Sequence, residues 1–163
     1  MFSLVRRKSA HCKYTSDQIL AAMGEYSIKK KKPLRGVGVK YLEEKNSELL
    51  FITLNKSEKD YSPSTMYYDY SINEWLFHWQ SQSTIADYTP TGQRYVDNDD
   101  ESYQPLLFVR KYKTAGGQTS PYFFLGPAEY KSHEGNKPIN IIWELENKIP
   151  PTNVQESNKF TIT

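Results

Sequence analysis

The apolar positions near the start of the chain follow a helical spacing. Ile19, Leu20 and Met23 form one apolar stripe, and Thr15 and Gln18 precede it at the spacing of a capping box. A glycine directly after Met23 is a common helix terminator. This pattern predicts a short helix of about two turns over this segment.

After residue 36 the spacing becomes that of β-strands. Residues 37–41 alternate apolar and polar side chains, and residues 49–54 form a continuous apolar run typical of a buried strand. The polar residues between these segments supply a turn, so we expect a hairpin. Residues 76–82 (LFHWQSQ) alternate again and predict a strand, and residues 93–96 are expected to open a short helix.

The last third of the chain predicts a β-meander of four strands. Their sequences are PLLFVRKY, PYFFLG, AEYKSHEG and PINIIWELE. Turn signals separate them at intervals of about ten residues, as in small barrels and sandwiches. We therefore expect an α+β, β-rich fold, a small open or closed β-barrel with one or two short flanking helices.

Charge divides the chain into unlike parts. Residues 1–40 hold ten Lys and Arg and two acidic residues, whereas residues 41–163 hold eleven basic and seventeen acidic residues. We expect a basic N-terminal arm (1–14), a single recognition domain (15–151) and a polar tail (152–163). The basic end favours an anionic partner, most commonly nucleic acid, although a solvated flexible arm explains it equally well.

Two features indicate the cellular setting. Cys12 is the only cysteine, so no internal disulfide can form, and a reducing cytoplasm fits best. No apolar run approaches the 18 or so residues that a transmembrane helix needs, and the first residues lack the apolar core of a secretory signal. We expect a cytoplasmic chain without a membrane partner.

Familiar catalytic motifs are absent from the sequence. The three histidines have no zinc-site spacing, and there is neither a phosphate-binding GxxxxGK[ST] loop nor a GxSxG elbow. We therefore expect a non-enzymatic chain without a cofactor. One catalytic alternative remains, a metal-dependent nuclease site formed by convergence of Asp69, Glu74, His78, His133 and Glu134.

Polar and aromatic groups concentrate in a few segments that suit nucleic-acid binding. Residues 77–83 combine rings with glutamine amides, which can stack on bases or contact their edges. Arg94 beside a glycine suggests a phosphate clamp, and Lys111 lies on a strand face that can meet phosphate. Trp79 is as well explained by a place in the core. The predicted nucleic-acid-binding residues are Tyr70, His78, Trp79, Gln80, Ser81, Gln82, Arg94, Lys111, His133 and Glu134.

Several motifs in fixed order resemble the family catalogued as domain of unknown function 3427. They are SPSTMYYDYSINEWLFHWQSQS, TPTGQRY, LLFVRKY and PYFFLGPAEYKSHEGNKPINIIWELE, and the resemblance runs from about residue 6 to residue 151. It implies the C-terminal part of a bacterial DEAD/DEAH-type superfamily-two helicase, a group that often carries a phospholipase-D-like nuclease domain. Helicase or nuclease domains, in the same or a partner chain, are the partners it implies, in a restriction or phage-defence setting. The residues of a motor or nuclease are absent here, so neither activity carries over.

These observations favour a DNA-recognition module of a helicase–nuclease system. By fold-level analogy with PUA, EVE and SRA domains, a flipped or modified base would enter a pocket of Tyr70, His78, Trp79 and His133. One alternative is a protein-interaction or sensing module that uses the tyrosine-rich surface. The second alternative is the metal-dependent nuclease.

Overall fold

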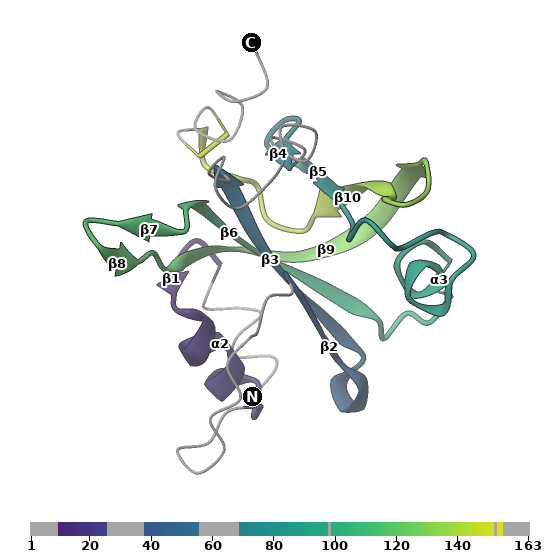
Figure 1. Ribbon diagram of the computed structural model, residues 1–163, viewed down its shortest axis with the longest axis horizontal. Helices are drawn as coiled ribbons and strands as arrows, with labels where there is room; N and C mark the ends of the chain where they lie inside the picture. The colour runs from purple at the N-terminus through teal and green to yellow at the C-terminus, as the bar shows by residue number, and fades with distance from the viewer. Residues whose placement is uncertain (1–9, 26–37, 56–68, 98, 152, 155–163) are drawn as a thin grey trace.

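The computed structural model describes residues 10–25, 38–55, 69–97, 99–151 and 153–154, and within them an eight-stranded sheet dominates (Figure 1). Its strand order is β2-β3-β6-β9-β10-β5-β4, with β1 paired to β9, and β7 and β8 form a separate hairpin. The predicted basic arm up to residue 9 and the predicted tail from residue 155 lie outside the described residues. The strands are β1 Lys13–Tyr14, β2 Val39–Leu42, β3 Ser47–Asn55, β4 Tyr70–Ser71, β5 Leu76–Gln80, β6 Gln104–Tyr112, β7 Thr114–Ala115, β8 Gln118–Thr119, β9 Tyr122–Glu134 and β10 Asn140–Leu145; the helices are α2 Ser16–Ala22 and α3 Pro90–Val96, with a 3-10 turn at Glu43–Lys45.

Both predicted helices form, with ends set by their caps. At α2 the Thr15 N–H donates to Gln18 Oε1 at 2.9 Å and the Gln18 N–H donates to Thr15 Oγ1 at 3.2 Å, which completes the predicted capping box. α3 begins earlier than predicted because Thr89 caps it and Pro90 takes its first position. Neither of these seven-residue helices, nor any other helix of the described ranges, is long and apolar enough to cross a membrane.

The apolar runs of the central strands result from the positions of these strands within the sheet. β2 and β3 pair antiparallel and form the predicted hairpin. β3 then pairs parallel with β6, a neighbour that the sequence did not indicate. Strands that are covered on both faces are apolar at consecutive positions, which accounts for the LLFITL and PLLFV runs.

Alternate residues of β3 and β6 point into two separate hydrophobic cores. Leu49, Phe51, Leu106 and Phe108 point to one face, where α2 covers them with Ile19, Leu20 and Met23. On the other face the sheet bends over itself, so that β3 and β6 pack against β5, β10 and α3. That second cluster, the inner core, consists of Leu50, Ile52, Leu54, Phe77, Trp79, Tyr95, Leu107, Val109, Leu125, Ala128, Ile139, Ile141, Trp143, Leu145 and Ile149.

Two strands predicted after Pro121 are a single long strand, β9. Its first part pairs with β1 and β6, and its second part pairs with β10. Gly126, with φ of 98°, lies near the end of the first part, two residues before the pairing with β10 begins at Ala128, and adopts a backbone conformation that other residues rarely take. The α+β, β-rich class is confirmed, and the sheet is open, since no pairing of described residues joins its end strands β2 and β4.

Gly92→Ala should destabilise the fold. A Cβ on this buried helical glycine would lie 1.9 Å from the carbonyl oxygen of Ala86, so the loop before α3 would have to move. Overpacking of this kind costs about 1–3 kcal/mol, occasionally more. Urea unfolding measures the loss, and Gln93→Ala on the exposed side of the same helix should change stability by less than about 0.5 kcal/mol. Equal stability of the two variants would contradict this packing.

Candidate functional site

A cavity of about 350 Å³ opens at one end of the inner core. It lies beside the β7–β8 hairpin, which projects on the opposite side of the molecule from α3 (Figure 1). The floor is apolar and consists of inner-core side chains that are less than a tenth exposed: Leu54, Phe77, Val109, Leu125 and Ile149. We call this cavity the basic pocket because Lys13 and Lys111 also line it.

The pairing of the strands places two lysines on the face of the sheet that also carries floor residues of the pocket. Lys13 on β1 pairs with Phe123 on β9, and Phe123 pairs with Val109 on β6, so the three side chains share one face. Lys111 lies two residues beyond Val109 and therefore on the same face. Both lysines and Phe123 line the cavity, and no Asp or Glu is among its lining residues in the described part of the chain. Lysines beside apolar walls are a combination that suits an anion with an apolar body.

Arg110, on the opposite face of β6 from Lys111, makes contacts that stabilise the edge of the basic pocket. Its guanidinium carbon lies 4.3 Å from the centre of the Tyr122 ring, and its Nε donates to Thr53 Oγ1 at 2.9 Å. Its Nη1 donates to the carbonyl oxygen of Ser120 at 3.2 Å, and Ser120 is part of the pocket lining. Arg110 therefore holds in place the segment at Ser120 that leads into β9 and borders the basic pocket.

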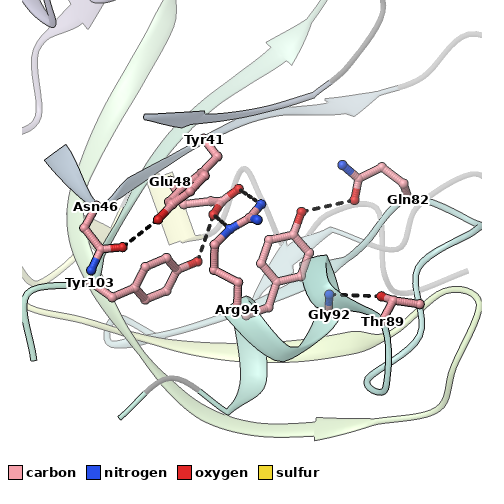
Figure 2. Close-up of polar contacts among 9 residues, drawn as sticks. Tyr41, Asn46, Glu48, Gln82, Thr89, Gly92, Arg94 and Tyr103 are labelled. Carbon is pink, nitrogen blue, oxygen red and sulfur yellow. Dashed lines mark hydrogen bonds and ion pairs between the residues drawn. The ribbon is translucent and has the colours of Figure 1, made fainter. Parts of the chain in front are cut away.

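The other end of the inner core holds a buried ion pair (Figure 2). Glu48 is fully buried at the start of β3, with the same alternation as Leu50, so its carboxylate points into the inner core. Arg94 of α3 meets it with two hydrogen bonds, Nε to Oε2 at 2.7 Å and Nη2 to Oε1 at 3.0 Å. The Tyr103 hydroxyl donates to the same carboxylate at 3.1 Å. A bidentate arginine with one further donor satisfies the buried charge.

Tyrosines surround this ion pair. The Arg94 guanidinium carbon lies 4.0 Å from the ring centre of Tyr41 and 5.6 Å from that of Tyr95. Burial and then the Glu48 carboxylate raise the pKa of Tyr95 to about 12, and the same two causes also raise the pKa of Tyr103. Partial burial lowers the pKa of Arg94, but the hydrogen bond and charge of Glu48 outweigh it, so that pKa is raised.

The predicted phosphate clamp is part of this scaffold. The Arg94 guanidinium binds Glu48, and its side chain is only 24% exposed. The Gly92 N–H donates to Thr89 Oγ1 at 3.1 Å as the cap of α3. In this structure the Arg94 guanidinium and the Gly92 N–H therefore donate to other residues of the chain. Sequence reasoning missed Glu48 because it directly precedes an apolar run, although an acid in that position is itself the signal of a buried partner.

Alternation along β5 divides the predicted residues 77–83 between two faces. Trp79 is 4% exposed, with its ring edge-on to Tyr95 at 5.4 Å, so the expectation that it faces an open pocket is wrong. Ser81 also lies inside, where its hydroxyl accepts the Ile139 N–H, and Gln82 accepts the Tyr95 hydroxyl.

Four other predicted residues gather on the outward face of β4, β5 and β9. His78 stacks on Tyr70, with the ring centres 4.7 Å apart. Gln80 donates to Asn140 Oδ1 at 3.1 Å, and Asn140 pairs across β10 with Glu134. Tyr70, His78, Gln80 and Glu134 therefore form an outward group, separate from the basic pocket that contains Lys111.

His133 belongs to a different contact. Its Nδ1 lies 2.6 Å from the Tyr130 hydroxyl and its Nε2 lies 3.3 Å from Asp87 Oδ2. Asp69 accepts the Gln80 backbone N–H at 2.8 Å, and Glu74 pairs with Lys148. The described ranges contain no group of three or more His, Cys, Asp or Glu placed to hold a metal ion, so the residues of the nuclease hypothesis do not converge there.

A family comparison agrees with the order of motifs in the sequence. The model of the family described as Domain of unknown function (DUF3427) matches residues 9–156, which is most of the chain. The chain therefore belongs to this family. No curated protein matches it.

Arg94→Met should destabilise the protein strongly. The substitution leaves the Glu48 carboxylate buried without its cation, and breaking a buried pair in this way costs about 3–5 kcal/mol. Urea unfolding measures the loss. The double variant Glu48→Gln/Arg94→Met removes the charge as well and should recover most of the stability. A loss below about 1 kcal/mol for the single variant would contradict a structural role for the pair.

Stability should fall as the pH rises from about 10 to about 12. Tyr95 keeps its proton in the folded state up to a pKa of about 12, whereas an unfolded tyrosine loses it near 10. Above pH 10 the unfolded state therefore binds fewer protons, and stability declines by up to about 1.4 kcal/mol per pH unit for this residue. Unfolding across this range should show a shallower decline for Tyr95→Phe than for the wild type. Tyr88→Phe, at a position that is 65% exposed, should leave the slope unchanged.

Proposed function

We propose that this member of the DUF3427 family is a nucleic-acid recognition module that binds DNA through the basic pocket. The observation that carries the proposal is the pairing of two lysines, Lys13 and Lys111, with an apolar floor on one face of the sheet. The described residues that line the cavity include no Asp or Glu.

A nucleotide has both properties that this pocket complements. Its phosphate is an anion that lysine binds as a compact point charge, and its base is a flat body with an apolar face. Phe123 supplies an aromatic ring beside Lys13, and the His11 ring stacks on Phe123 with 5.7 Å between ring centres. The site therefore favours a nucleotide over a small inorganic anion, which would leave the apolar floor uncovered.

The family resemblance supplies the setting for this proposal. Helicase or nuclease domains, in the same or a partner chain, would act on the DNA that this domain holds, in a restriction or phage-defence system. The outward group is a second candidate contact, in which Tyr70 and His78 offer ring stacking and Gln80 offers amide hydrogen bonds. Recognition of a modified base remains a proposal for that surface.

A protein-interaction role is the second candidate function. Ile72 and Trp75, on the turn between β4 and β5, are 39% and 43% exposed. Neighbouring exposed apolar side chains of this size are typical of surfaces that bind other proteins. A helicase core that binds the wild type but not Trp75→Ala, in high salt and without DNA, would favour this role.

Lys111→Ala should weaken DNA binding and its salt dependence. Removing one phosphate contact lowers the slope of log affinity against log salt by about 0.7–0.9. Fluorescence anisotropy with a labelled oligonucleotide at several salt concentrations measures both quantities. Lys13→Ala should have a similar effect, because its side chain lies on the same face of the pocket.

Lys131→Ala is the matched control for both variants. Lys131 is an exposed lysine on the second part of β9, where its Nζ lies 3.6 Å from Glu144. Its loss should leave the salt slope unchanged. If all three alanine variants lower affinity equally, the attraction is a property of the whole surface, and the assignment of the pocket is wrong.

A further inference from the structure

The β7–β8 hairpin projects from the body of the molecule beside the basic pocket (Figure 1). Every residue from 112 to 119 is exposed. Gly116 and Gly117 have φ of 58° and 79°, the type I′ pattern of a two-residue turn that twists in the same sense as its strands. A Cβ at either glycine would meet no atom of the described residues within 4 Å, its chain neighbours excepted. The tip is therefore narrow and stands in open space.

The side chains of the hairpin form hydrogen bonds but carry no charge. Thr114 pairs with Thr119, and Ala115 pairs with Gln118. Residues 114–119 include no aromatic ring, no acidic residue and only one apolar side chain. Protein partners are bound mainly through large apolar or aromatic anchors, and single nucleic-acid strands through rings that stack on their bases. The hairpin instead suits the edges of paired bases, which present hydrogen-bonding groups in the grooves of a duplex.

The dimensions of the hairpin match one groove of duplex DNA. Strands advance about 3.4 Å per residue, so the hairpin from Lys113 to Gly116 is about 10 Å long, against a major-groove depth of about 8.5 Å. Two strands about 4.8 Å apart fit with their side chains into the major groove, about 12 Å wide, but not into the minor groove, about 6 Å wide.

The charge of this segment suits the borders of the same groove. Lys113 is exposed at the base of the hairpin, where its carbonyl oxygen accepts the Ser120 N–H at 2.9 Å. With the tip at the floor of the groove, this base lies at the level of the flanking phosphates. The sequence contains no Asp or Glu from residue 102 to residue 128, so no acidic side chain of the segment itself opposes the approach.

We infer that the β7–β8 hairpin inserts into the major groove of duplex DNA. Gln118 contacts a base edge, for which its amide has the donor and acceptor that match adenine N7 and N6, and Lys113 contacts a phosphate. The inference rests on the proposed function and deepens it, because it assigns the form of DNA that is bound and a second element that binds it.

Two variants and a matched control test the hairpin. Deletion of Thr114, Ala115, Gln118 and Thr119 leaves Lys113 and Ser120 to flank the same Gly116–Gly117 turn, and this pair is already joined by a hydrogen bond. The deleted residues are all exposed, so the thermal unfolding temperature should change little. The second variant is Gln118→Ala. Its control is Gln93→Ala, the same substitution at an exposed position of α3, on the opposite side of the molecule (Figure 1).

Fluorescence anisotropy compares three labelled duplexes of one sequence. They are B-form DNA, the same DNA with 7-deaza-adenine, which lacks the N7 acceptor in the major groove, and A-form RNA, whose major groove is too narrow to enter. The full chain should bind the DNA at least about tenfold more tightly than the RNA, and the shortened hairpin should abolish this difference. Gln118→Ala and 7-deaza-adenine should each lower affinity about fivefold, without a further loss when combined, and Gln93→Ala should bind like the wild type.

The outcomes separate this inference from the proposed function. If the shortened chain folds and binds the DNA duplex like the wild type, while Lys13→Ala still weakens binding, insertion is overturned and the proposed function stands. Equal affinity of the full chain for the DNA and RNA duplexes also overturns insertion. If the shortened chain does not fold, Gln118→Ala with the 7-deaza-adenine duplex decides, and no effect of either change overturns the inference. If no nucleic acid binds, the proposed function itself fails.

Discussion

The fold depends on a single strand that belongs to two parts of the sheet. β9 pairs with β1 and β6 over its first half and with β10 over its second half. Gly126 lies shortly before the change between these partners, in a backbone conformation that a side chain would strain. Because the strand continues through the bend, the inner faces of β5 and β10 are brought over those of β3 and β6. The inner core and the basic pocket at its edge both result from this arrangement.

The two ends of the inner core differ in the charged groups that lie there. At the α3 end, Glu48 and Arg94 satisfy one another with two hydrogen bonds in a site where water has little access (Figure 2). Burying this pair costs desolvation of both ions, so its contribution lies more in fixing the position of α3 than in net stability. At the other end, the described lining of the basic pocket includes Lys13 and Lys111 and no Asp or Glu.

Local patterns in the sequence predicted the elements well and their connections less well. The capping box of α2, the β2–β3 hairpin and the strand at β5 are visible from neighbouring residues alone. The parallel pairing of β3 with β6 is not, because it joins segments that are distant in sequence and leaves no periodic trace beyond continuous apolar runs. Pro127 and Gly126 suggested a turn between two strands, whereas the structure accommodates both inside β9.

The candidate site was harder to predict, for a related physical reason. Sequence reasoning favoured aromatic and amide-rich segments, but Trp79 has the same alternation as the inner-core residues and is buried with them. Lys111 was identified from its strand, but Lys13 and Phe123 join it only through pairing across β1, β9 and β6. The row of side chains that builds the inner core continues from Leu107 through Val109 to Lys111 on one face of β6. That row leaves the inner core between Val109, which is buried, and Lys111, which is not, and both residues line the basic pocket. The same alternation therefore determines the last buried residue of the row and the first charged one.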